Sequence, residues 1–169
     1  MKRLLRAFDF PVRVFFIVLF FAFASSFAEV EPKAESAAKA VSALQETLSQ
    51  SFDYCDVYYF EEMDRIKVRV AVDGLADLVN PLIEAGYDET FEAWAEYRKN
   101  VVTMYDALLE YVQTNFREDL TISFHLVSDE DVRNGKSPHD FISINGGTKS
   151  VFDILYFKRY MREHPIEGG

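Results

Sequence analysis

The sequence lacks most of the residues on which simple functional assignments depend. Its 169 residues include one cysteine, Cys55, so no disulfide can form within the chain and stability must come from packing. The three histidines match none of the short ligand spacings of zinc sites, which predicts no metal site. Gly146-Gly147 lacks the further glycine and the Gly-Lys pair of a phosphate loop. We therefore expect no cofactor and no metal, and no motif identifies a catalytic residue.

Positive charge is also scarce. The chain has 18 Lys and Arg against 28 Asp and Glu, for a formal net charge of −10. Binding to phosphate backbones and anionic lipid surfaces depends on neutralisation by basic residues. The balance therefore argues against nucleic acid and against an anionic membrane surface as partners. It also helps keep an exported protein in solution.

Residues 1–28 have the pattern of an export signal. A basic start precedes an unbroken apolar run from Val14 to Ala24, and Ser26-Phe27-Ala28 places small residues where a signal peptidase reads. We predict cleavage between Ala28 and Glu29, and a secreted or periplasmic protein with no stable membrane span after cleavage. An uncleaved anchor is the alternative, but a span needs roughly 20 apolar residues and this run is shorter.

The remaining chain is predicted to form one α+β domain over residues 29–155, followed by a basic and aromatic tail, partly disordered, over 156–169. Apolar residues between Asp88 and Phe116 recur mostly at steps of three and four, which predicts a long amphipathic helix. The same spacing predicts an N-terminal helix over residues 34–51. A shorter helix from Leu75, capped by Asp73, should kink or split at Pro81, since proline removes a backbone donor.

Strands are predicted by strict alternation. Arg65 to Val72 and Leu120 to Val127 alternate apolar and polar side chains, and Tyr54 to Phe60 is rich in aromatic residues. A final hairpin is predicted from Phe141, with Asn145-Gly146-Gly147 supplying the positive φ angles of a tight turn. Whether the segment from Ser150 is a strand or a helix running to Glu163 stays open.

These elements predict a mainly antiparallel sheet of about four strands in two hairpins. We expect one face of the sheet to be covered by the long central helix, by the shorter helix before it and by the N-terminal helix. The acidic cluster Ser128-Asp129-Glu130-Asp131 departs from the calcium-loop pattern, and we interpret it as a turn that caps a short helix.

One strand pair and one helix position stand out as a candidate binding surface. Tyrosine offers a large contact area with a polar end, and arginine and lysine attract acidic partners. Arg98 interrupts the apolar stripe of the long helix, which makes that point a second candidate. The competing interpretation is that the tyrosines merely cover the sheet. The candidate binding residues are Tyr54, Tyr58, Arg65, Lys67, Arg69 and Arg98.

The function that these observations favour is non-catalytic. We expect an exported, soluble, acidic domain that binds a protein, a peptide or a small envelope ligand. The alternative is a small exported hydrolase or thiol enzyme that uses Cys55 or a carboxylate with His125 or His139. The sequence does not specify the ligand or the oligomeric state.

Overall fold

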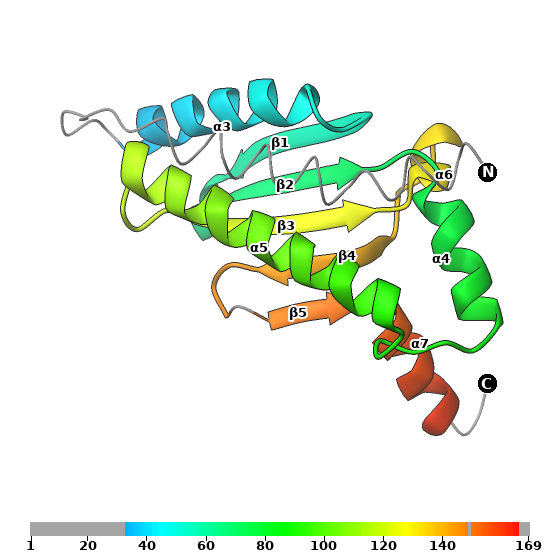
Figure 1. The fold of residues 1–169 in the computed structure, drawn as a ribbon. Coiled ribbons are helices and arrows are strands. Elements are labelled where there is room, and N and C mark those ends of the chain that lie inside the picture. Colours follow the sequence, from blue (N-terminus) through cyan, green and yellow to red (C-terminus); the bar gives the residue numbers. More distant parts are fainter. Residues whose placement is uncertain (1–32, 149, 166–169) are drawn as a thin grey trace.

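Five strands form one mixed sheet in the order β1-β2-β3-β4-β5 (Figure 1). Neighbouring strands are antiparallel except β2 and β3, which are parallel. Both predicted hairpins are present, as β1–β2 and β4–β5. The predicted strand over Leu120 to Val127 is present as β3 and lies between the hairpins, so the sheet has five strands, not about four, and is mixed. The strands are β1 (Tyr54–Phe60), β2 (Arg65–Ala71), β3 (Thr121–Val127), β4 (Asp140–Asn145) and β5 (Ser150–Asp153).

The parallel pair follows from the connection between β2 and β3. Two helices separate these strands in the chain, and a long crossover brings the next strand back in the same direction, whereas a two-residue turn reverses it. The computed structural model describes residues 33–148 and 150–165. The predicted export signal lies outside these residues. Within them, no helix is both long enough and apolar enough to cross a bilayer.

The helices agree with the predicted periodicity to within a few residues at each end. They are α3 (Lys33–Ser49), α4 (Leu75–Glu84), α5 (Glu92–Asn115), the short α6 (Asp129–Arg133) and α7 (Ile154–Glu163), with a single 3-10 turn, η1 (Glu61–Met63), between β1 and β2. The predicted interruption at Pro81 does not split α4, which is one helix from Leu75 to Glu84. Gly86, with a φ of +80°, lies just beyond the end of that helix.

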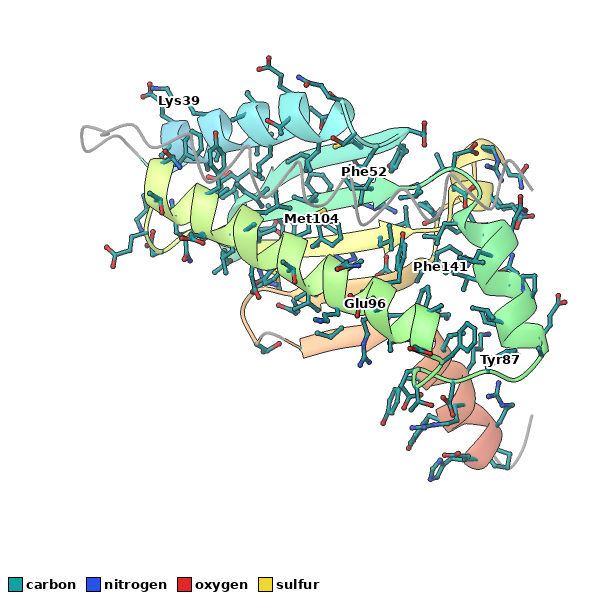
Figure 2. The ribbon with its side chains drawn as sticks, viewed as in Figure 1. Lys39, Phe52, Tyr87, Glu96, Met104 and Phe141 are labelled. Carbon is teal, nitrogen blue, oxygen red and sulfur yellow. The ribbon has the colours of Figure 1, made fainter. Side chains whose placement is uncertain are left out.

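The core lies between the sheet and the helices. Ile66, Val68 and Val70 of β2 are fully buried with Ile122 and Phe124 of β3, as strand alternation predicts. Helix α5 crosses this face, and α3 packs against β1 (Figure 1). Figure 2 shows Met104 on the side of α5 that faces the sheet and Lys39 on the outer side of α3. The arrangement differs from the expected one at α4, which lies beyond the ends of β2 and β3 and not over the face.

The start of α4 is stabilised by a residue distant in the sequence. The carboxylate of Asp129 accepts hydrogen bonds from the backbone N–H groups of Gly74 and Ala76, each at 2.8 Å. Asp73, the predicted cap, instead pairs with Arg133 at 2.6 Å. Ser128 caps α6 by accepting from the N–H of Asp131, as the acidic turn predicted.

The C-terminal segment contains both of the structures that the sequence left open. Strand β5 ends at Asp153, and α7 begins at Ile154 because the Asp153 carboxylate accepts from the N–H groups of Leu155 and Tyr156. The first part of the expected tail, residues 156–163, is therefore helical and packs near β4 and β5.

Candidate ligand-binding face

The strand register aligns polar side chains in rows across the sheet face opposite the core, here called the open face. Side chains directly opposite each other on paired strands share a face and lie close together. Successive pairings join Tyr58 to Lys67, Lys67 to Ser123, Ser123 to Asn145 and Asn145 to Ser150. This first row crosses all five strands and contains one charged residue, Lys67.

A second row lies beside the first. It joins Asp56 to Arg69, Arg69 to His125, His125 to Ser143 and Ser143 to Phe152. In this row Arg69 lies opposite a carboxylate, that of Asp56, so its charge has an acidic neighbour. The two rows therefore differ in electrostatics: one has a cation without a carboxylate, and the other has both signs.

The open face contains a hollow of about 300 Å³, here called the sheet hollow. That volume is at the lower end of the range for small-molecule sites. Its polar lining consists of Arg65, Lys67, Ser123, His125, Ser143 and Asn145. Its apolar lining consists of Phe60, Met63 and Ile144. All of these residues come from β1, η1, β2, β3 and β4, so no described helix longer than one turn contributes to the lining.

The two cations of the sheet hollow are held differently. Arg65 Nη1 donates to Asn145 Oδ1 at 2.8 Å, and Arg65 Nε donates to Thr121 Oγ1 at 3.4 Å. These bonds fix the guanidinium against β3 and the end of β4. Lys67, in contrast, has neither a hydrogen bond nor an ion pair within the described residues. Its ammonium group is available to a ligand.

The turn after β4 fits closely against the neighbouring strand. Gly146 has no positive φ, contrary to the prediction for Asn-Gly at this turn. Glycine is required there for space, because a Cβ atom would overlap the carbonyl oxygen of Ile122. At Gly147 an added Cβ would instead meet the guanidinium of Arg65. The turn therefore shapes one end of the sheet hollow.

His125 is oriented by a carboxylate. Its Nδ1 lies 2.9 Å from Asp140 Oδ2, and both side chains are partly buried. Such a pair fixes the imidazole ring and leaves Nε2 free for another partner. Neither Ser123 nor Ser143 forms a hydrogen bond with His125, although both line the same hollow.

The structure brings together five of the six residues predicted as binding residues. Tyr54, Tyr58 and Arg69 lie on the open face with Arg65 and Lys67, and the last two line the sheet hollow. Burial and the nearby Asp56 raise the pKa of Tyr54, while Arg69 opposes that shift.

Arg98 lies elsewhere. It is on α5, on the other side of the sheet, where Nη1 pairs at 3.4 Å with the buried carboxylate of Asp153. The break in the apolar stripe at Arg98 is thus explained by an internal ion pair.

The sequence analysis did not predict that β3 and β4 contribute to the binding surface, and it named His125 only as part of the alternative enzyme. Ser123, His125, Ser143 and Asn145 alternate with apolar residues, which was the signal that they share a face of their strands. Only the parallel pairing of β2 with β3 places that face beside Lys67, and alternation carries no information about strand order.

Cys55 and the sheet hollow lie on opposite faces. Cys55 pairs with the buried Val70, and His125 pairs with Arg69 on the open face. Burial, reinforced by Asp56, raises the pKa of the Cys55 thiol to about 11.

His139 lies 2.5 Å from Asp131, in an exposed loop. The backbone N–H of His139 lowers the pKa of Asp131. Over residues 33–148 and 150–165, no three His, Cys, Asp or Glu side chains converge as metal ligands would.

Comparison of the chain with models of protein families, with curated proteins and with solved structures gives no significant match.

Proposed function

We propose that the protein is an exported, non-catalytic binding module whose binding surface is the open face of the sheet. The observation that carries this proposal is the sheet hollow, which combines aromatic, hydroxyl and cationic side chains in an acidic chain. Small-molecule sites in proteins combine an apolar lining with a few polar groups at fixed positions, and the sheet hollow contains both.

The exposed aromatic residues extend the surface beyond the hollow. Phe60 and Tyr58 of β1 are 40% and 37% exposed, and Phe152 of β5 is 36% exposed. Aromatic residues of this kind are enriched where proteins contact partners. Protein, peptide and small envelope ligand remain the three partner types that such a surface accommodates.

A photo-crosslinking experiment in the source cells tests the binding surface. A photoreactive amino acid placed at Tyr58 reports on the open face, and one placed at Glu96 reports on the outer side of α5, which Figure 2 shows. We expect adducts from Tyr58 only, detected by intact-mass spectrometry for both small and protein ligands. Adducts should disappear when Lys67 and Arg69 are both changed to Glu. The matched control is Lys99→Glu, since Lys99 is an exposed cation on α5. Adducts that form equally at Glu96, or that persist in the double variant, would show that the surface is wrong.

Export itself is tested at the N-terminus of the protein recovered from cells. Cleavage after Ala28 leaves Glu29 as the first residue, which peptide mass spectrometry detects in the secreted or periplasmic fraction. Recovery of the intact N-terminus in membranes would favour the uncleaved anchor.

A hydrolase is the second candidate, and one observation favours it. His125, which is paired with Asp140, lines the same hollow as Ser123 and Ser143, and a serine with a histidine is the pairing of a nucleophile with its base. A nucleophile must lie within hydrogen-bond reach of the base, and neither serine forms that bond. Burst and steady-state assays with short p-nitrophenyl esters decide between the two. If the wild-type protein hydrolyses these esters and both Ser143→Ala and His125→Gln abolish the turnover, the protein is a hydrolase and the binding proposal is wrong.

A further inference from the structure

The sheet hollow also indicates which class of ligand it takes, an inference that rests on the proposed binding function. None of the nine lining residues is acidic, although the chain has 28 Asp and Glu. Lys67 and Arg65 supply positive charge to the same wall. The hollow therefore favours an anion over a cation or a neutral molecule.

The number of free cations limits the charge of the ligand. Arg65 already donates to Asn145 and Thr121, and Arg69 faces Asp56 across the β1–β2 pair. Lys67 is the lining cation without an ion pair or hydrogen bond within the described residues. One unpaired ammonium group matches one negative charge.

Two serine hydroxyls line the same hollow as Lys67. Ser123 is 8% exposed, lies directly opposite Lys67 in the β2–β3 register and makes no hydrogen bond within the described residues. Its hydroxyl is not sealed from solvent, so it can donate a hydrogen bond to a ligand in the hollow. Ser143, in the next row, is likewise without an intramolecular partner in the part of the chain that the structure describes. An ammonium group with two hydroxyl donors is a set that an oxyanion satisfies.

Part of the lining of the hollow is apolar and exposed to solvent. Phe60 is 40% exposed and Met63 is 60% exposed, and both are lining residues. Contact with the apolar part of a ligand would remove these two side chains from water, which is favourable. The volume of about 300 Å³ restricts the ligand to a small molecule or a single end group.

We propose that the sheet hollow binds a small organic monoanion, a carboxylate attached to a short apolar group. Lys67 forms the ion pair with the carboxylate, and Ser123 and Ser143 donate to its oxygens. Phe60 and Met63 contact the apolar group. Arg65, held by Asn145, shapes the wall and adds positive potential.

Hexanoate is the probe, and hexanamide is its neutral counterpart of nearly the same shape. We expect saturable binding of hexanoate, followed by backbone NMR shifts at Ser123, Ser143 and Lys67. Because a charge-assisted contact is lost, hexanamide should bind about tenfold or more weakly. Lys67→Met should weaken the binding of hexanoate by a similar factor. Lys99→Met removes the same charge from an exposed site on α5 and should leave the affinity unchanged.

Each other outcome is decisive. Equal affinity of hexanoate and hexanamide for the hollow would contradict the proposal that the ligand is a carboxylate, while the proposed binding surface would stand. Tighter binding of inorganic phosphate than of hexanoate would contradict the proposal that the ligand is a monoanion with an apolar group. Absence of shifts with any of these probes would overturn the ligand class, whereas the photo-crosslinking from Tyr58 would still decide the binding function. Ser123→Ala, a small change in a folded strand, should weaken the binding of hexanoate more than that of hexanamide, because a carboxylate is a stronger hydrogen-bond acceptor than an amide carbonyl.

Discussion

The indole nitrogen of Trp94 donates to both carboxylate oxygens of Asp153, at 3.0 and 3.1 Å. Trp94 is in the first turn of α5 and Asp153 ends β5, so this contact joins the long helix to the edge of the sheet. Asp153 is 3% exposed, and it also caps α7 and pairs with Arg98. One buried carboxylate thus holds three elements together.

Asp153→Ala is expected to destabilise the fold by about 3 kcal/mol. The estimate combines a lost helix cap, about 1 kcal/mol, with an indole hydrogen bond to a charged acceptor, about 2 kcal/mol. Urea unfolding followed by tryptophan fluorescence and circular dichroism measures the change. Asp153→Asn keeps an acceptor for the cap and for Trp94, and it should lose less than half as much. A loss below about 1 kcal/mol for the alanine variant would contradict this role.

The free edge of β1 is closed by a side chain. Gln45 of α3 donates its amide N–H to the carbonyl of Cys55 at 3.1 Å and accepts from the N–H of Val57 at 2.9 Å. It thereby occupies positions that a neighbouring strand would otherwise fill. Exposed strand edges with unpaired backbone groups promote association between chains.

Gln45→Ala should therefore increase self-association relative to the wild type. Light scattering coupled to gel filtration, over a range of protein concentrations, measures this. Gln50→Ala, at an exposed position just after α3, is the control and should behave like the wild type. If Gln45→Ala has the mass of the wild type at every concentration, the edge does not depend on this residue.

Asp64 gives the fold an acid-sensitive contribution. A hydrogen bond from Arg117, with a second from the hydroxyl of Tyr59, holds the pKa of Asp64 below its ordinary value. A carboxyl group whose pKa is lower in the folded state stabilises the fold above its unfolded pKa, about 3.9. That stability is lost as the pH falls through the lower, folded value.

Asp64→Asn removes this pH-dependent part while keeping a residue that tolerates the φ of +48°. Because the Asp64 side chain is 39% exposed, we expect a loss of only about 1 kcal/mol at pH 7, discounted for solvent screening. The difference from the wild type should shrink as the pH falls below the unfolded pKa of about 3.9. Urea unfolding at several pH values measures it, with Asp106→Asn on the exposed side of α5 as the control. A difference that is constant with pH would show that the contact is not electrostatic.

Some of these contacts follow from sequence patterns, and others do not. The alternation in Arg65–Ala71 and Thr121–Val127 predicts which side chains share a face, because the period of a strand is two residues. It therefore predicts that Lys67 and Arg69 lie opposite the core. It does not predict that β3 pairs with β2 in parallel, since that depends on how α4 and α5 pack.

The sequence patterns likewise do not predict the long-range polar contacts. Asp73 is the nearest candidate to cap α4, yet Asp129 takes that role from 55 residues beyond Gly74. Pro81 does not split α4, which shows that tertiary packing of Leu75 and Val79 outweighs one missing backbone donor. In each case the local preference was sound, and a distant contact changed the result.

The two adjacent glycines of the β4–β5 turn offer a matched pair for the last prediction. An alanine methyl at Gly146 would collide with the backbone of Ile122, which is fixed in β3. At Gly147 it would meet the end of the Arg65 side chain, which can move. We therefore expect Gly146→Ala to cost about 1–3 kcal/mol, as overpacking does, and Gly147→Ala to cost well under about 1 kcal/mol.

The same pair separates stability from ligand binding. Gly147→Ala should displace Arg65 from Asn145 and change the NMR shifts of both residues, so hexanoate affinity should change although the free energy of unfolding does not. Thr148→Ala, at an exposed position of the same turn, controls for any alanine in this loop. Equal destabilisation by Gly146→Ala and Gly147→Ala would mean that the turn can shift as a unit. The close fit against Ile122 would then not be what positions the wall of the sheet hollow.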